Sequence, residues 1–125
     1  MDNLFVNYNN SLALKEKGYN KPFFFFYRSD DETKEIHHAM VIKPLAYNQK
    51  NVDDEVISAP TQQEALIWLE EQHNIYVSVV YDYLTKVWNC SVRRTGCDHI
   101  EEFYNYTHRK NAVNAALEYV IKSLI

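Results

Sequence analysis

Residues 60–83, PTQQEALIWLEEQHNIYVSVVYDY, contain the pattern that decides the fold. Thr61 can accept a hydrogen bond as a helix N-cap, and Glu64, three residues later, can return one to complete a capping box. Asn74 can end the helix in the left-handed conformation. β-Branched and aromatic residues follow at once. The stretch therefore predicts a helix over residues 62–73 that leads directly into a strand.

The chain after this strand predicts a hairpin and a covering helix. A turn at residues 84–86 can lead into VWNCSVRR (87–94), and EEFYNY (101–106) can add a third strand. From near Thr107 onward, apolar residues recur at three- and four-residue spacing, as in an amphipathic helix. We expect the central helix, the hairpin strands and the final helix to share one core. It is formed by Leu66, Leu69, Val77, Val79, Trp88, Ala116, Leu117, Val120 and Ile121.

The chain before the central helix predicts a short helix and two strands. Ser11 is an expected N-cap, and Gly18 is the expected stop of this helix. The run PFFFFY (22–27) has the composition of a strand, and EIHHAMVIKP (35–44) can pair with it in the antiparallel direction. The prediction is a single α+β domain over residues 1–125, in the order α-β-β-α-β-β-β-α, with an antiparallel sheet and helices mainly on one face. Residues 28–56 form a polar, variable region within that domain.

Charge and composition exclude several classes of protein. The net charge is −4, and it divides evenly, because residues 1–60 carry 7 basic and 9 acidic groups while residues 61–125 carry 6 and 8. The absence of a basic segment argues against nucleic acid as the main partner. The longest apolar runs are far shorter than the roughly 20 residues of a membrane-spanning helix, so no membrane partner is expected. Two cysteines and no signal-like opening predict a cytoplasmic protein without a disulfide framework.

Three quoted segments resemble a known group of proteins. They are LALKEKGYNKPFFFFY (12–27), ISAPTQQEALIWLEEQHNIYVSV (57–79) and NAVNAALEYVIKSLI (111–125). Together they resemble small uncharacterised proteins of bacterial prophages and integrative elements, which share a Lys-Glu-x-Gly-aromatic helix end, a SAPT turn before a Trp-containing helix, a hairpin and a final helix. The resemblance implies this order of elements and a mobile-element setting, but no activity. The start of the final helix, THRKNA (107–112), differs from the acidic residues that are usual in the group.

The aromatic run provides the candidate partner-binding residues. In a strand, Phe23, Phe25 and Tyr27 point to one side and Phe24 and Phe26 to the other. We expect the first three to join the core, because they offer more rings and a tyrosine hydroxyl that can form a hydrogen bond. Phe24 and Phe26 are then either covered by the polar region or exposed as a protein-binding surface. A base-stacking platform is less favoured, because few cations flank the run.

Arg109 and Lys110 carry the alternative hypothesis of nucleic-acid binding. The order helix, three strands, helix is that of the double-stranded RNA-binding domain, whose last helix begins with several cations. Arg109, Lys110 and Ala112 match this signature, but Val113 stands where another cation is expected. The alternative reading is that both cations are the solvated start of an amphipathic helix. The second half would then resemble that domain only in its order of elements.

Catalytic and metal chemistry have little support in the sequence. Cys90, Cys97 and His99 have a wider spacing than the knuckles of structural zinc sites, so no metal is expected. Only Gly18 and Gly96 occur, which excludes a glycine-rich phosphate loop and argues against a nucleotide cofactor. We therefore expect a non-catalytic interaction or accessory protein of a mobile genetic element, not an enzyme and without a cofactor. Its protein partner and its oligomeric state are not predicted by these patterns.

Overall fold

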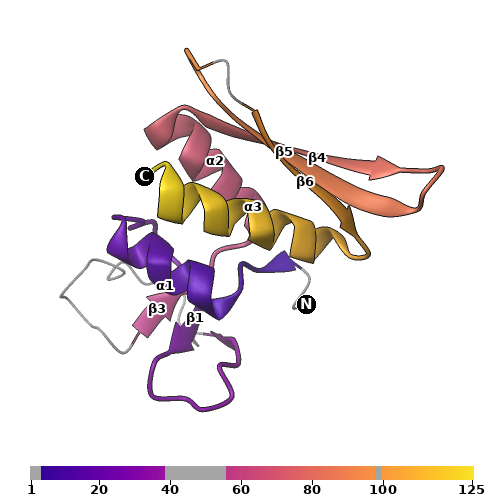
Figure 1. Cartoon of the computed structure of the whole chain (residues 1–125). Helices are drawn as coiled ribbons and strands as arrows, with labels where there is room; N and C mark the ends of the chain where they lie inside the picture. Colours follow the sequence, from indigo (N-terminus) through magenta and orange to yellow (C-terminus); the bar gives the residue numbers. More distant parts are fainter. Residues whose placement is uncertain (1–3, 39–55, 98–99) are drawn as a thin grey trace.

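The computed structural model describes residues 4–38, 56–97 and 100–125, and it shows an α+β fold with three helices and two three-stranded antiparallel sheets (Figure 1). The predicted fold class is confirmed. The observed order is α-β-β-β-α-β-β-β-α, with α1 (Tyr8–Glu16), β1 (Phe25–Arg28), β2 (His37–His38), β3 (Val56–Ser58), α2 (Gln62–His73), β4 (Ile75–Asp82), β5 (Val87–Arg94), β6 (Ile100–Tyr106) and α3 (Arg109–Ser123).

The strand β3 was not predicted, and the strands form two sheets where one was expected. β1 lies between β2 and β3 in the first sheet, and the second sheet has the order β4-β5-β6. All three residues of β3 are buried. A strand of three residues that is buried throughout shows no apolar–polar alternation, which is the pattern that identifies longer strands. The predicted pairing of the aromatic run with residues 35–44 is confirmed for His37 and His38 by the register Phe26↔His37. Residues 39–44, and with them most of the predicted polar region 28–56, lie outside the described residues.

The central helix α2 has the predicted bounds and caps. The Thr61 side chain accepts a hydrogen bond from the Glu64 backbone N–H at 3.1 Å, and the Thr61 N–H donates to the Glu64 carboxylate at 3.0 Å. Asn74 ends the helix in the left-handed conformation with φ of 55°. β4 begins at the next residue, so helix and strand meet without a loop.

The first helix begins earlier than predicted. Asn7, not Ser11, is the N-cap, and its side chain accepts a hydrogen bond from the Asn10 N–H at 2.9 Å. Ser11 lies inside the helix, where it is buried. Asparagine and serine are equally good N-caps, so residue type alone does not distinguish Asn7 from Ser11. The stop at Gly18 is confirmed by φ of 96° and by a hydrogen bond from the Tyr19 N–H to the Leu14 carbonyl at 2.9 Å.

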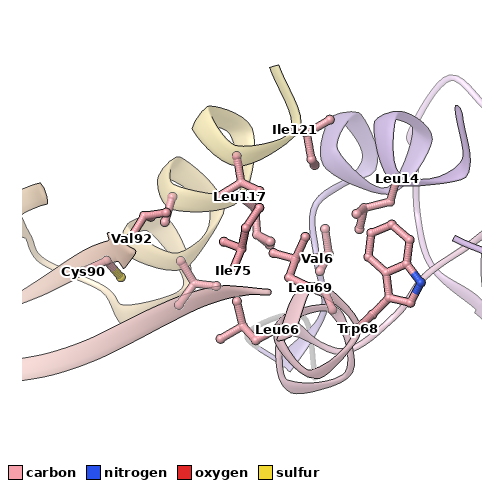
Figure 2. Packing of buried hydrophobic residues seen from close by; sticks show 14 of the residues in the cluster. Val6, Leu14, Leu66, Trp68, Leu69, Ile75, Cys90, Val92, Leu117 and Ile121 are labelled. Carbon is pink, nitrogen blue, oxygen red and sulfur yellow. The ribbon is translucent and has the colours of Figure 1, made fainter. Parts of the chain in front are cut away.

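The nine residues predicted to share a core do so. Six are buried in one large cluster, which we call the main core, and Val77, Val79 and Trp88 pack against it. In Figure 2, Leu117 and Ile121 of α3 lie near Leu14 of α1 and Leu69 of α2. α3 thus packs on one face of the β4-β5-β6 sheet and also contacts α1 (Figure 1).

A second group of buried residues lies under the first sheet. This smaller cluster consists of Phe5, Tyr27, Ile57 and Ala59, with Phe25 packed against it. α1 contacts both β3 and α3, so it connects the smaller cluster to the main core. None of the helices in the described ranges is long and apolar enough to cross a membrane.

Candidate functional site

The aromatic run follows the predicted alternation only in part, because β1 begins at Phe25 and the ring of Phe23, before it, contacts that of Phe26 at 6.3 Å. Phe23 and Tyr27 are buried, and the Tyr27 hydroxyl donates a hydrogen bond to the Val6 carbonyl at 2.7 Å. Phe25 is half-buried and packs against the ring of Phe5, with centroids 5.0 Å apart. One point differs from the prediction: Phe25 and Tyr27 pack in the smaller cluster and not in the main core.

The two candidate partner-binding residues are less open than a flat platform requires. Phe24 is 37% exposed and its ring stacks with that of His38, while Phe26 is half-buried and stacks with His37 at 5.5 Å. The strand β2 therefore sets His37 against Phe26, whereas the ring of His38 lies closer to Phe25, with centroids 4.8 Å apart. His37 is itself held by Asp31, since Nε2 and Oδ2 are 3.1 Å apart. Hydrogen bonds from Thr33 and then from His37 lower the pKa of the Asp31 carboxyl.

The two candidate nucleic-acid contacts occupy the first turn of α3. The Arg109 guanidinium donates to the side-chain oxygen of Gln62 at 3.2 Å, and the Gln62 amide donates to the Lys110 carbonyl at 3.1 Å. Gln62 is buried, so these bonds join the starts of α2 and α3 inside the fold. Arg109 is thus half-buried and bonded within the fold, and is not the solvated side chain that the alternative reading expected. The Lys110 ammonium forms no hydrogen bond or ion pair with the part of the chain that the structure describes.

A larger uncovered surface lies on the second sheet. In the described ranges, α3 and α2 are the helices that contact this sheet, and Figure 1 shows α3 along one of its sides only. The side chains that alternate with the core residues form the other side, which we call the open face. Four of its apolar residues are substantially exposed, namely Tyr76 (44%), Val80 (58%), Ile100 (39%) and Tyr104 (57%).

Strand register arranges the open face in rows. One row is Tyr76, Arg93 and Ile100, and the next is Ser78, Ser91 and Glu102. Because the middle row has two serines between larger neighbours, it forms a shallow hollow of about 170 Å³. A bulge between Trp88 and Cys90 shifts the register of the third row. There the Asn89 side chain accepts a hydrogen bond from the Asn105 N–H at 3.0 Å.

The cysteines and histidines are separated by the fold. Cys90 is buried and Cys97 is exposed, and burial raises the pKa of the Cys90 thiol to about 11. A thiol in such surroundings is mostly protonated at neutral pH and a poor nucleophile. His99 lies outside the described residues. Within the described ranges, no three His, Cys, Asp or Glu side chains gather in a way that could hold a metal ion.

Comparison of the chain with protein-family models, with curated proteins and with solved structures finds no match. The site must therefore be judged from its geometry. The open face was not among the sites predicted from the sequence. The available signal was β4 itself, where Tyr76 and Val80 alternate with Val77 and Val79, so that both faces of one strand carry apolar side chains.

Proposed function

We propose that the protein is a non-catalytic interaction module whose open face binds an amphipathic helix of a partner protein. The observation that carries this proposal is the exposure of Tyr76, Val80, Ile100 and Tyr104 on a sheet that the helices of the described ranges cover on one side only. Exposed apolar patches with polar neighbours mark sites of protein association. The resemblance to prophage and integrative-element proteins supports an accessory role in a bacterial mobile element.

The dimensions of the open face favour a helix over a second copy of the chain. Three strands about 4.8 Å apart and seven residues of about 3.3 Å each give a face of roughly 14 by 23 Å. This is too small for a standard interface, which buries about 800 Å² on each partner. It matches one helix, which is about 10 Å wide with its side chains. The opposite face of the same sheet already accommodates one helix of 15 residues, α3.

The polar residues of the open face favour a protein over a nucleic acid. Arg93 and Glu102 contribute one charge of each sign to its first two rows. A nucleic-acid surface requires several cations to neutralise phosphates. A helix that carries both acidic and basic residues beside its apolar stripe can pair with both charges. The basic start of α3 offers the alternative function, binding of duplex RNA, but Arg109 is already bonded to Gln62.

The first test compares surfaces by substitution. Tagged protein purified from its native cells should capture a specific partner, and the double variant Tyr76→Thr/Tyr104→Thr should lose it, because threonine keeps the strand propensity and removes the rings. Phe24→Thr tests whether partner capture depends instead on the surface that contains Phe24 and Phe26. Leu4→Thr/Ile67→Gln is the matched control, since both residues are similarly exposed but lie elsewhere. Partner capture that survives loss of both tyrosines would reject the open face.

The second test identifies what is bound. A photo-crosslinking amino acid at Val80 should join the protein to a helical segment of the partner, whereas the same group at Ile67 on α2 should not. Crosslinks to nucleic acid, together with binding of duplex RNA or DNA that weakens steeply with salt, would favour the alternative function. The melting temperature of each variant should stay close to that of the wild type, because exposed positions contribute little to stability.

A further inference from the structure

A cavity of about 570 Å³ lies between the N-terminal segment, the loop after β1 and the start of α3. Its wall includes Tyr8, Tyr27, Lys34, Lys110, Asn111 and Asn114. This volume is in the range of small-molecule sites, which is about 300 to 1,000 Å³. The cavity belongs to the side of the molecule that carries the smaller cluster, so it is distinct from the open face.

The charge of the cavity wall is opposite to that of the whole chain. Lys34 and Lys110 contribute two positive charges and Glu35 one negative charge, which gives +1 in a protein of net charge −4. The first turn of α3, which contains Lys110, has no acidic residue and no side-chain cap. The positive end of the helix dipole therefore adds to the two ammonium groups.

Lys34 is held in place in the cavity wall. Its ammonium donates to the Ser29 carbonyl at 2.7 Å and lies 4.8 Å from the centre of the Tyr8 ring. An ammonium has three N–H donors, so these contacts leave it able to donate to a ligand. Lys110 forms no hydrogen bond or ion pair through its ammonium with the described part of the chain. The two cations come from segments that are far apart in the sequence, and the fold brings them to one cavity.

Asn114 adds an oriented donor. Its side-chain oxygen accepts hydrogen bonds from the Asn7 N–H at 3.2 Å and from the Asn10 amide at 3.3 Å. Two donors from α1 and its cap thus fix the orientation of this amide. Its NH₂ group remains as a donor on a residue that lines the cavity. The fixed amide reduces the cost of ordering a donor when a ligand binds.

We propose that this cavity binds a small molecule that carries a phosphate group and a flat ring. Two ammonium groups and an amide donor match the several acceptor oxygens of a phosphate. The half-buried ring of Tyr8 offers an aromatic surface against which a flat ring can pack, while Tyr27 and Phe5 are buried behind a mostly polar wall. Polar groups that converge beside an aromatic ring fix the orientation of a ligand in such sites.

The test uses AMP, inorganic phosphate and adenosine with the full chain. AMP should shift the backbone amide NMR signals of Lys110, Asn111 and Asn114, and adenosine should bind much more weakly because it lacks the phosphate. Lys110→Met should weaken AMP binding about tenfold, which is the effect of losing one charge-assisted hydrogen bond. Lys34→Met should have a similar effect, and it provides a second variant if the first is poorly folded.

The control variant is Lys122→Met, on the same helix but distant from the cavity, where Lys122 pairs with Glu118 at 2.6 Å. This change should leave AMP binding within a factor of two of the wild type, since it removes the same charge from a different place. Equal binding of adenosine and AMP would overturn the proposal, as would equal losses in Lys110→Met and Lys122→Met. So would the absence of shifts at the cavity signals with both AMP and phosphate at millimolar concentration.

Discussion

The two buried regions of this protein are specified in different ways. The main core consists of apolar side chains that recur along α2, α3 and the long strands of the second sheet. The smaller cluster has few members, and hydrogen bonds between distant segments accompany it. The Tyr27 hydroxyl reaches the Val6 carbonyl, and the Lys15 ammonium reaches the Val56 carbonyl at 2.6 Å. Periodic apolar patterns thus specify the first region, whereas individual polar contacts tie the second region to its surroundings, since Val6 belongs to the main core.

The largest effect is expected in the main core. Leu117 of α3 is fully buried, so Leu117→Ala removes apolar contacts and leaves a cavity. We expect a loss of about 2 to 4 kcal/mol in the free energy of unfolding, measured by urea denaturation with tryptophan fluorescence. Leu84→Ala is the matched control, because Leu84 is almost fully exposed at the tip of the β4-β5 hairpin. It should change the free energy of unfolding by less than about 0.5 kcal/mol. Similar small effects at both positions would contradict the assignment of α3 to the main core.

A smaller effect is expected when a polar contact of the smaller cluster is removed. Tyr27→Phe keeps the ring but removes the donor to the Val6 carbonyl, which also accepts a weak bond from the Ser11 hydroxyl at 3.4 Å. We expect a loss of about 1 kcal/mol in the free energy of unfolding, the usual contribution of one hydrogen bond. The control is Tyr83→Phe, since Tyr83 is exposed in the hairpin turn. If Tyr27→Phe costs nothing, apolar burial alone holds the smaller cluster and the contrast between the two regions fails.

The sequence predicted most of the elements that have long periodic patterns or explicit caps. The bounds of α2 followed from Thr61, Glu64 and Asn74, and the inward face of α3 followed from its apolar spacing. The N-cap of α1 was predicted at the wrong residue because two good N-caps, Asn7 and Ser11, stand four positions apart. The strand β3 was missed because its three residues, all buried and at the end of a polar region, show no periodic pattern of apolar and polar residues.

The candidate site was less predictable than the fold. Alternation predicted the burial of Phe23 and Tyr27, but it placed Phe23 and Phe26 on opposite sides although their ring centroids are 6.3 Å apart. It also gave no sign that His37 stacks against Phe26. The cavity beside α3 combines residues from three distant segments, such as Lys34 and Lys110. No local pattern marks such a combination, because it arises from tertiary packing. The only sign of the open face in the sequence is that apolar residues occur on both faces of β4.

The smallest effect is expected at the edge of the main core, where His73 ends α2. Its ring lies against buried Trp68, with centroids 4.8 Å apart. Burial, and secondarily the charge of Arg94, lower the pKa of His73 below its ordinary value of 6.5. Below pH 6.5 the unfolded chain then binds more protons than the folded chain, so protonation favours unfolding. We expect the contribution of His73 to the free energy of unfolding to be complete above pH 6.5 and to decline as the pH falls toward its folded pKa.

The measurement is the free energy of unfolding as a function of pH for the wild type and for His73→Gln. The difference between the two curves isolates His73, because the effects of the other titrating groups cancel. A wild type that gains stability relative to the variant on acidification would show that the negative end of the α2 dipole, which favours the protonated ring, outweighs burial at this edge.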